Sequence, residues 1–247
     1  MLNNQLVLKY EAGGNPATVS TGSGDLGGKS YGRYQFSSTA GVVENFVEWL
    51  CNYPEDCYAN YGRVLKNAYP VNSSGFINEW KSIGTIDAEG FGKLQDEYAG
   101  DMYYNAGYFN LLNGGYDITK HNEAMKAVLF SRAIQYGPAN MCELWTEAVR
   151  LMGHPEISWV DDKCFDREMI ECIYNFLIQE CDNAYLTSKG TYHSPKDWAN
   201  GSYDVVKIGL RNRFVNEKAD ALKLLEDEGF EKNKNIKSSK ALQIKDF

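Results

Sequence analysis

The amino-acid sequence predicts a mainly α-helical fold of the α+β class, with a small β element near the N-terminus. From residue 40 onward, apolar residues recur every three or four positions over most of the chain, which is the period of helices with one buried face. Residues 12–33, in contrast, are rich in Gly, Ser, Thr, Asn and Asp, a composition that excludes a regular helix. We therefore expect a packed set of helices beside an ordered loop, with a β element over residues 18–37 and a hairpin through YGRYQF.

The helices can be placed from their periodicity and from the residues that begin and end them. Ser38 or Thr39 is suited to cap the first helix and Ser74 a later one, while Asp87 begins another. Gly137 ends the strongest of the periodic segments. The expected helices cover residues 40–50, 58–68, 75–83, 88–104, 120–136, 140–152, 165–187 and 204–228.

The sequence indicates a simple domain organisation, because no internal repeat and no Pro-, Gly- or Ser-rich linker divides the chain. We therefore expect one domain over residues 1–230. The last residues, 231–247 (EKNKNIKSSKALQIKDF), are polar and rich in lysine, so that we expect a flexible C-terminal tail there.

The chain is acidic, with a net charge of −8 and a pI near 5.0. A nucleic-acid-binding protein would show a basic patch, so we expect no nucleic-acid partner. No stretch approaches the roughly 20 apolar residues of a membrane span. The N-terminal sequence MLNNQLVLKYEAGG lacks the basic and the long apolar regions of a signal peptide. We therefore expect a monomer that is made in the cytoplasm without a signal peptide and does not insert into membranes.

The cysteines and histidines indicate neither a metal site nor a cofactor. No two cysteines form a CxxC pair, and the three histidines are isolated in the sequence. Cys51 and Cys57 flank a turn and are spaced for a small disulfide loop, but buried free thiols are the interpretation that we favour. No G-x-S-x-G motif is present, which argues against a serine hydrolase.

One segment, residues 10–36, departs from ordinary packing, because it holds two carboxylates among many glycines and hydroxyl side chains. Glu11 follows an apolar run, where partial burial would raise the pKa of its carboxyl toward the range that a general acid needs. Asp25 lies in the turn-prone sequence GSGDLGG, where it would stay solvated and ionised. Two carboxylates in unlike environments are typical of glycoside cleavage. The alternative for Asp25 is a turn residue without a chemical role.

This segment resembles the active-site region of lysozyme-like glycosidases. In goose-type lysozymes and lytic transglycosylases, a Glu ends a helix and precedes a Gly/Ser-rich loop and a G-x-x-Q element, which here correspond to Glu11 and residues 30–35 (SYGRYQ). Chitosanases of the same superfamily have a Glu and a Gly-rich stretch with an Asp, similar to residues 24–32 (GDLGGKSYG). Phage and prophage wall lysins are the most similar, also in residues 131–137 (SRAIQYG) and 211–217 (RNRFVNE).

The resemblance implies roles for seven residues. Glu11 would be the catalytic acid, and Asp25 a second carboxylate that hydrolysis needs and transglycosylation does not. The other matched residues would line the sugar cleft, although structural roles are the alternative for the last two: Ser30, Tyr31, Gln35, Gln135 and Tyr136.

These observations together predict a lysozyme-like enzyme that cleaves the glycan backbone of peptidoglycan, or of a related amino-sugar polymer. It would act at the bacterial cell wall as a phage lysin, after release or as part of a phage particle. The 17 Tyr and 5 Trp supply rings that stack on sugars, although many of them will fill the core. Two alternatives stay open, namely a chitosanase that acts on polyglucosamine and a glycan-binding phage structural protein without activity.

Overall fold

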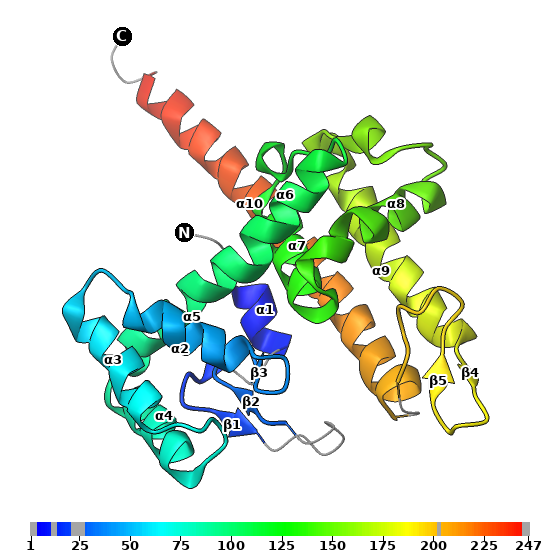
Figure 1. Cartoon of the computed structure of the whole chain (residues 1–247). Coiled ribbons are helices and arrows are strands. Elements are labelled where there is room, and N and C mark those ends of the chain that lie inside the picture. Colours follow the sequence, from blue (N-terminus) through cyan, green and yellow to red (C-terminus); the bar gives the residue numbers. More distant parts are fainter. Residues whose placement is uncertain (1–3, 11–13, 21–27, 202–203, 244–247) are drawn as a thin grey trace. The chain divides into compact units, whose positions relative to one another are not determined.

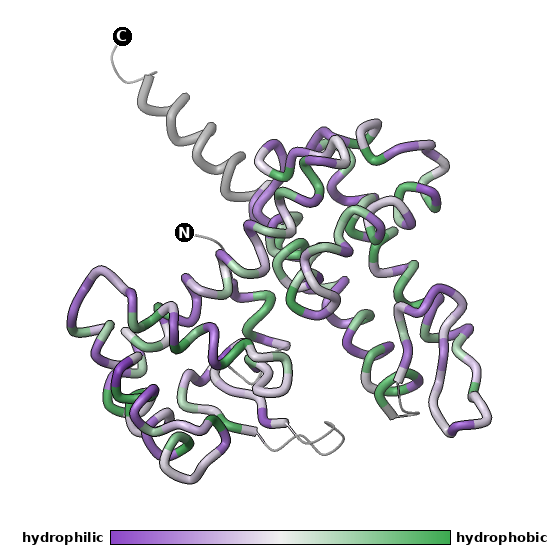
Figure 2. The backbone as a smooth tube through the Cα atoms, viewed as in Figure 1, coloured by the Kyte–Doolittle hydropathy of each residue, from purple (hydrophilic) through white to green (hydrophobic). Residues whose placement is uncertain are grey.

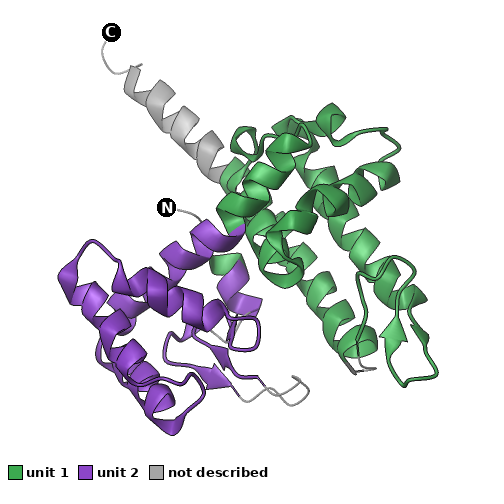
Figure 3. Cartoon of the chain, viewed as in Figure 1, with its two compact units in different colours: residues 1–6, 104–247 green, residues 7–103 purple. Residues whose placement is uncertain are grey.

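The computed structural model (Figure 1) describes the backbone of residues 4–10, 14–20, 28–201 and 204–243. It describes their side chains as far as Gly229, apart from that of Asp204. These residues are mainly helical and include two small antiparallel sheets, which confirms the predicted α+β class. The chain divides into two compact units (Figure 3), which we call unit 1 (Met1–Leu6 with Tyr104–Phe247) and unit 2 (Val7–Tyr103).

Unit 2 contains a small sheet and a set of helices. The helix α1 (Gln5–Tyr10) leads into this unit, and the sheet has the order β1-β2-β3. The sheet confirms the β element expected over residues 18–37, and its strands are β1 (Val19–Ser20), β2 (Ser30–Tyr31) and β3 (Phe36–Ser37). The helices that follow are α2 (Val42–Cys51), α3 (Asp56–Asn67), α4 (Ser74–Ile86) and α5 (Ala88–Ala99).

An aromatic cluster forms the core of unit 2, and α2 lies at its centre. Phe46 of α2 has no exposed surface, and its ring lies 5.1–6.0 Å from those of Tyr98, Trp80 and Phe91. The close packing of α2 against α3 depends on Gly62, because a Cβ atom there would lie 2.4 Å from the backbone nitrogen of Cys51. These contacts make the helices of unit 2 a framework for the sheet, since β3 packs on α2.

Two of the predicted helix caps differ from those in the structure. The N-cap of α2 is Gly41, in a left-handed conformation with φ 71°, and it makes no side-chain capping bond. Ser73, rather than Ser74, caps α4, because its extended backbone directs Oγ toward the N–H of Phe76, which donates to it at 3.1 Å. The predicted cap of α5 is confirmed, since Asp87 accepts a hydrogen bond from the backbone of that helix.

Unit 1 is built from longer helices and one hairpin. The π-helical segment Gly100–Asn105 continues α5 into α6, and a second π-helical segment, Asp204–Leu210, leads into α10. The helix expected over 165–187 ends at Asn183, and its last residues form β4 of a hairpin with β5, which was not predicted because each strand has only two residues. The elements are α6 (Ala106–Asn113), α7 (Glu123–Tyr136), α8 (Met141–Leu151), α9 (Asp166–Asn183), β4 (Tyr185–Leu186), β5 (Tyr192–His193) and α10 (Arg211–Gln243).

The helix α7 forms the centre of unit 1. It contacts α6, α8, α9 and α10, and it is buried on nearly all sides, which is the pattern of a central helix. Figure 2 shows hydrophobic and hydrophilic stretches alternating along the surrounding helices, as expected for helices with one buried face. The predicted end of α7 is confirmed, since Gly137 follows it with φ 84°.

The domain boundary and the flexible tail that the sequence predicts are not tested by the structure. The backbone of α10 is helical as far as Gln243, and the flexible tail over 231–247 and the single domain over 1–230 stay predictions.

All six cysteines are free thiols, so that Cys51 and Cys57 form no disulfide. In the part of the chain that the structure describes, no helix has the length and hydropathy of a membrane span, and no cluster of His, Cys, Asp and Glu is arranged to hold a metal ion.

Candidate active site

The two carboxylates at the centre of the prediction, Glu11 and Asp25, lie outside the described residues. In the chain, Glu11 comes directly after the last residue of α1, and Asp25 comes between β1 and β2. The structure therefore describes the framework on either side of these positions, which consists of α1, the segment that leads into β1, and the sheet.

The segment that leads into β1 is held in place by side chains from the β2–β3 turn, α4 and α5. Arg33 Nε donates to the backbone oxygen of Gly14 at 3.1 Å. The backbone oxygen of Pro16 accepts from Trp80 Nε1 at 2.9 Å and from Gln95 Nε2 at 3.1 Å. These bonds fix the backbone at Gly14 and Pro16, shortly before β1.

The turn between β2 and β3 is tied to α5. The Arg33 guanidinium forms an ion pair with Asp96, with distances of 2.8 and 2.9 Å to the two carboxylate oxygens. Tyr34 Oη donates to the same carboxylate at 2.7 Å, and the Arg33 backbone N–H donates to Gln95 Oε1 at 2.9 Å. Gly32 is required here, because its φ is 71° and a Cβ would lie 2.3 Å from Gln95 Oε1.

One row of side chains across the sheet faces the core. Val19, Tyr31 and Phe36 are aligned across the three strands, and Tyr31 and Phe36 have no exposed surface. Tyr31 Oη donates to Asn72 Oδ1 at 3.0 Å, and burial raises the pKa of Tyr31 to about 12. The ring of Tyr31 also meets that of Trp80 edge to face at 5.1 Å. Tyr31 thus takes part in the packing of the sheet, and its predicted contact with sugar stays a prediction.

The adjacent row consists of three serines, which we call the serine row: Ser20, Ser30 and Ser37. Each of them is partly exposed. Ser20 Oγ donates to Gln35 Oε1 at 3.0 Å, and Gln35 Nε2 donates to the backbone oxygen of Gly32 at 3.1 Å. Ser30 and Gln35 thus both adjoin Ser20, the first through strand register and the second through a hydrogen bond, and their contact with sugar stays a prediction.

The remaining two predicted site residues, Gln135 and Tyr136, belong to unit 1. Gln135 Oε1 accepts a hydrogen bond from Arg132 at 2.6 Å. Tyr136 Oη donates to the backbone oxygen of Trp198 at 2.9 Å, and burial raises the pKa of its phenol. Both residues therefore take part in the internal contacts of unit 1, and their contact with sugar stays a prediction.

A buried ion pair joins the two later motifs of the sequence. Arg132 Nη2 lies 2.6 Å from Glu217 Oε2, and neither side chain has exposed surface. Ser131 Oγ donates to the other oxygen of Glu217, and Arg213 lies 3.4 Å from Glu217 on the same helix. Sequence reasoning missed this pair, although an arginine amid the apolar residues of a central helix was the signal for it.

The fold is shared with chitosanases. The chitosanase of Bacillus subtilis MY002 has a TM-score of 0.57 and 18% sequence identity, covering 93% of this chain and 92% of that one. The GH46 chitosanase of Gynuella sunshinyii, solved in complex with chitotetraose, has a TM-score of 0.58 and 11% identity, covering 92% and 87%. These similarities show that the chain has a chitosanase-like fold, in agreement with the predicted lysozyme-like α+β fold.

Residues 4–218 match the family described as "Type VI secretion system spike protein VgrG3-like, C-terminal", and the chain therefore belongs to this family. The spike protein VgrG3 of Vibrio cholerae serotype O1 is 28% identical over 130 residues, which are 52% of this chain and 12% of that protein. This membership corrects the prediction of a phage lysin, because the family is that of a secretion-system spike protein. A short motif beside the predicted acid reflects local geometry and chemistry, and it does not define the larger protein to which such a domain belongs.

Proposed function

We propose that the chain is a glycosidase that cleaves the backbone of an amino-sugar polymer, peptidoglycan in the first place, with Glu11 as its general acid. The observation that carries the proposal is the place of Glu11 in the chain. It comes directly after α1 and before a sheet with a row of serines, in a fold shared with chitosanases. Membership of the spike family supports delivery to the wall polymer as part of a secretion spike.

The proposed chemistry begins with a protonated Glu11, which donates its proton to the glycosidic oxygen while positive charge develops at the sugar C1. In the hydrolytic form, Asp25 holds a water for attack on C1 or stabilises the developing charge. In the transglycosylase form, the 6-hydroxyl of the sugar attacks C1, and Glu11 takes up the proton of that hydroxyl. The serine row and Gln35 would then hydrogen-bond the hydroxyl groups of the sugars next to the cleaved bond.

A chitosanase is the second candidate function, and the fold similarity to chitosanases favours it. Polyglucosamine is cationic, and the net charge of −8 suits such a substrate. A glycan-binding spike component without activity is the third possibility, and it differs from both enzymes in releasing no product.

The substitution Glu11→Gln tests the proposal, because it keeps the shape of the side chain and removes the acid. We expect the clearance of purified peptidoglycan to fall by roughly 100-fold or more, the usual scale for the loss of an acid–base group. Glu89→Gln, at an exposed position of α5, is the matched control and should keep full activity. Unchanged activity of Glu11→Gln would contradict the assignment of the acid.

The products and a second variant separate the candidate reactions. Mass spectrometry of digested peptidoglycan gives a 1,6-anhydro end for transglycosylation and a reducing sugar end for hydrolysis, and the same assay on chitosan tests the second candidate. Asp25→Asn should abolish hydrolysis by two carboxylates and leave transglycosylation nearly unchanged. Binding to either polymer without release of any product would contradict both enzymatic candidates and support a glycan-binding protein without activity.

A further inference from the structure

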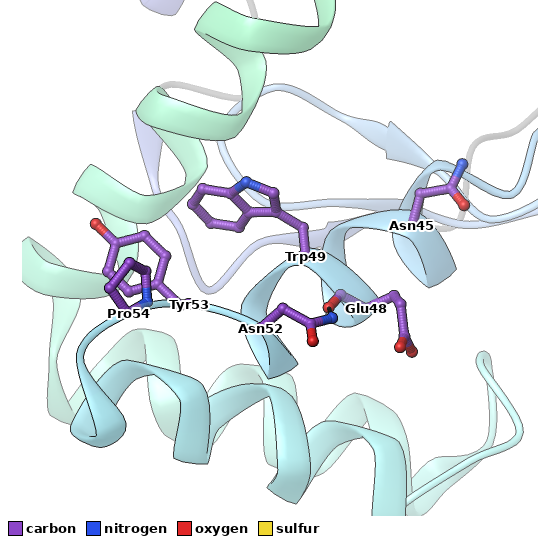
Figure 4. Close-up of a pocket in the computed structure, with 6 residues that line it drawn as sticks. All are labelled: Asn45, Glu48, Trp49, Asn52, Tyr53 and Pro54. Carbon is purple, nitrogen blue, oxygen red and sulfur yellow. Dashed lines mark hydrogen bonds between the residues drawn. The ribbon is translucent and has the colours of Figure 1, made fainter.

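A surface pocket with a volume of about 450 Å³ follows one face of α2 in unit 2 (Figure 4). Sites for small molecules have volumes of about 300–1,000 Å³. Three of the six lining residues belong to α2, and their spacing of three or four positions places them on one face of the helix. The chain directly after the helix supplies the rest, and the lining residues are Asn45, Glu48, Trp49, Asn52, Tyr53 and Pro54.

The composition of this face is unusual because it places a tryptophan among polar residues. The other face of α2 already supplies the core with Val43, Phe46, Val47 and Leu50. Trp49 is only partly buried, and the other α2 residues that line the pocket are exposed. The ring of Trp49 therefore adds apolar surface next to polar side chains. A sugar has an apolar ring face bordered by hydroxyl groups, so this combination of side chains is suited to bind one.

The rings at the pocket are held by their neighbours. Trp49 stacks on Phe46 at 6.0 Å and meets Tyr53 edge to face at 5.0 Å, and Tyr53 in turn meets Tyr58 at 5.7 Å. Tyr53 Oη donates to Glu97 of α5 at 2.6 Å, and this bond raises the pKa of the phenol. Because the rings are already fixed, a ligand that stacks on them would lose little affinity to ordering the side chains.

The polar groups of the pocket complement an amino sugar. Glu48 forms an ion pair with Lys66 of α3 at 2.5 Å, which lowers the pKa of the Glu48 carboxyl and keeps it ionised. Asn52 Nδ2 donates to the backbone oxygen of Glu48 at 2.8 Å, which orients its amide. The exposed amide of Asn45 supplies further donors and an acceptor. A carboxylate and two amides around a ring match an ammonium or acetamido group and the hydroxyls of a hexose.

We propose that this pocket is a second glycan-binding site, which binds an amino-sugar oligosaccharide through Trp49 and the polar residues around it. The class of ligand rests on the proposed function, while the site itself uses none of the residues of the candidate active site. Its role would be to hold a strand of the polymer during repeated cleavage.

The test uses the full chain with Glu11→Gln, so that the ligand stays intact, and follows the indole N–H signals of the five tryptophans by NMR. The probes are a glucosamine hexamer and, separately, an N-acetylglucosamine hexamer. We expect the signal of Trp49, assigned by Trp49→Phe, to shift saturably, and that of the fully buried Trp145 to stay unchanged. Trp49→Ala should weaken binding to the insoluble polymer roughly 10-fold.

Two further variants keep the outcome clear. Asn45→Ala with Glu48→Gln changes only exposed side chains, so it leaves the fold intact and should weaken binding as well. Trp159→Ala, a tryptophan in unit 1 with 63% of its surface exposed, is the matched control and should bind normally. A Trp49 signal that does not move with either hexamer would overturn the proposal even if the wild-type chain cleaves the polymer. If the Trp49 signal shifts with a hexamer but the wild-type chain does not cleave the polymer, the glycan-binding pocket is supported and the proposed function is refuted.

Discussion

At the scale of single residues, Arg132 places a charged group in the core of unit 1, where burial of an unpaired charge is costly. Burial alone would lower the pKa of this guanidinium, but the Glu217 carboxylate raises it above its ordinary value, so that the group stays charged. The rings of Tyr174, Phe214 and Tyr136 lie 5.3–5.9 Å from its carbon and add cation–π attraction. The arginine therefore depends on one carboxylate for the balance of its charge.

Removal of the Glu217 carboxylate alone should lower the stability of unit 1 much more than removal of both members of the ion pair. We expect Glu217→Gln to destabilise unit 1 by about 3–5 kcal/mol, because it leaves an uncompensated charge in the core. The double variant Arg132→Met with Glu217→Leu should recover most of this loss, since apolar pairs often replace buried ion pairs at little cost. Denaturant unfolding of the single and double variants measures both values, and a double variant no more stable than Glu217→Gln would contradict this account.

At the scale of the elements, the approach of α4 to the segment after Glu11 is unusually close. A Cβ atom on Gly84 would lie 2.7–2.9 Å from the backbone and Cβ of Ala17. Backbone atoms cannot move aside as a flexible side chain does, and the neighbouring Pro16 is held by Trp80 of the same helix. The helix thus sets the path of the chain at Pro16 and Ala17, shortly before β1.

The substitution Gly84→Ala should therefore act on stability and on activity together. We expect a loss of about 1–3 kcal/mol from overpacking, and a fall in glycan cleavage because the segment beside Glu11 shifts. Gly75→Ala in the same helix is the matched control, since its Cβ would meet only Ser73 Oγ, at 3.9 Å. Thermal unfolding and a zymogram measure the two effects, and equal behaviour of both variants would speak against the role given to α4.

The same scale shows how far the sequence determines the fold. The long amphipathic helices were predictable, because their period is repeated over several turns, and Asp87 and Gly137 marked their ends correctly. The caps of α2 and α4 were misplaced, since the choice between adjacent residues depends on backbone angles and not on side-chain type. Strands of two residues, such as β4 and β5, carry too little pattern to be recognised.

The candidate site was predictable in part for related reasons. The local motif identified the lysozyme-like fold, in which Ser30 lies on β2 and Gln35 in the turn before β3, each of them next to Ser20. The alignment of the serine row depends on strand register, which a sequence does not reveal. The pairing of Arg132 with Glu217 joins residues 85 positions apart, and only the packing of α7 against α10 brings them together.

At the scale of the whole molecule, the tyrosines set a limit to stability in alkali. Burial raises the pKa of Tyr31, Tyr98 and Tyr104 to about 12, from an ordinary value of 10.0. Between these two values the unfolded chain loses the phenol protons that the folded chain keeps. The unfolded state then binds fewer protons, so that the free energy of unfolding falls as the pH rises from 10 to 12.

The buried tyrosines should accordingly leave the melting temperature nearly constant below pH 10. Between pH 10 and 12 they should make it fall steeply. Tyr98→Phe should make this fall less steep, because it removes one of the titrating groups, whose buried hydroxyl has no hydrogen-bond partner. Tyr185→Phe, at a position with 60% exposure, should leave the profile unchanged. A melting temperature that stays level up to pH 12 would refute the prediction.

The order of the two units along the chain bears on how the protein is made. Unit 2 is one continuous segment, Val7–Tyr103, whereas unit 1 combines the first residues with everything after Tyr103. Ribosomes add about 5–20 residues per second, so unit 2 emerges complete within seconds while most of unit 1 is still untranslated. Unit 2 can therefore fold during translation, whereas the first residues of unit 1 cannot pack within their own unit until the rest of it has been synthesised.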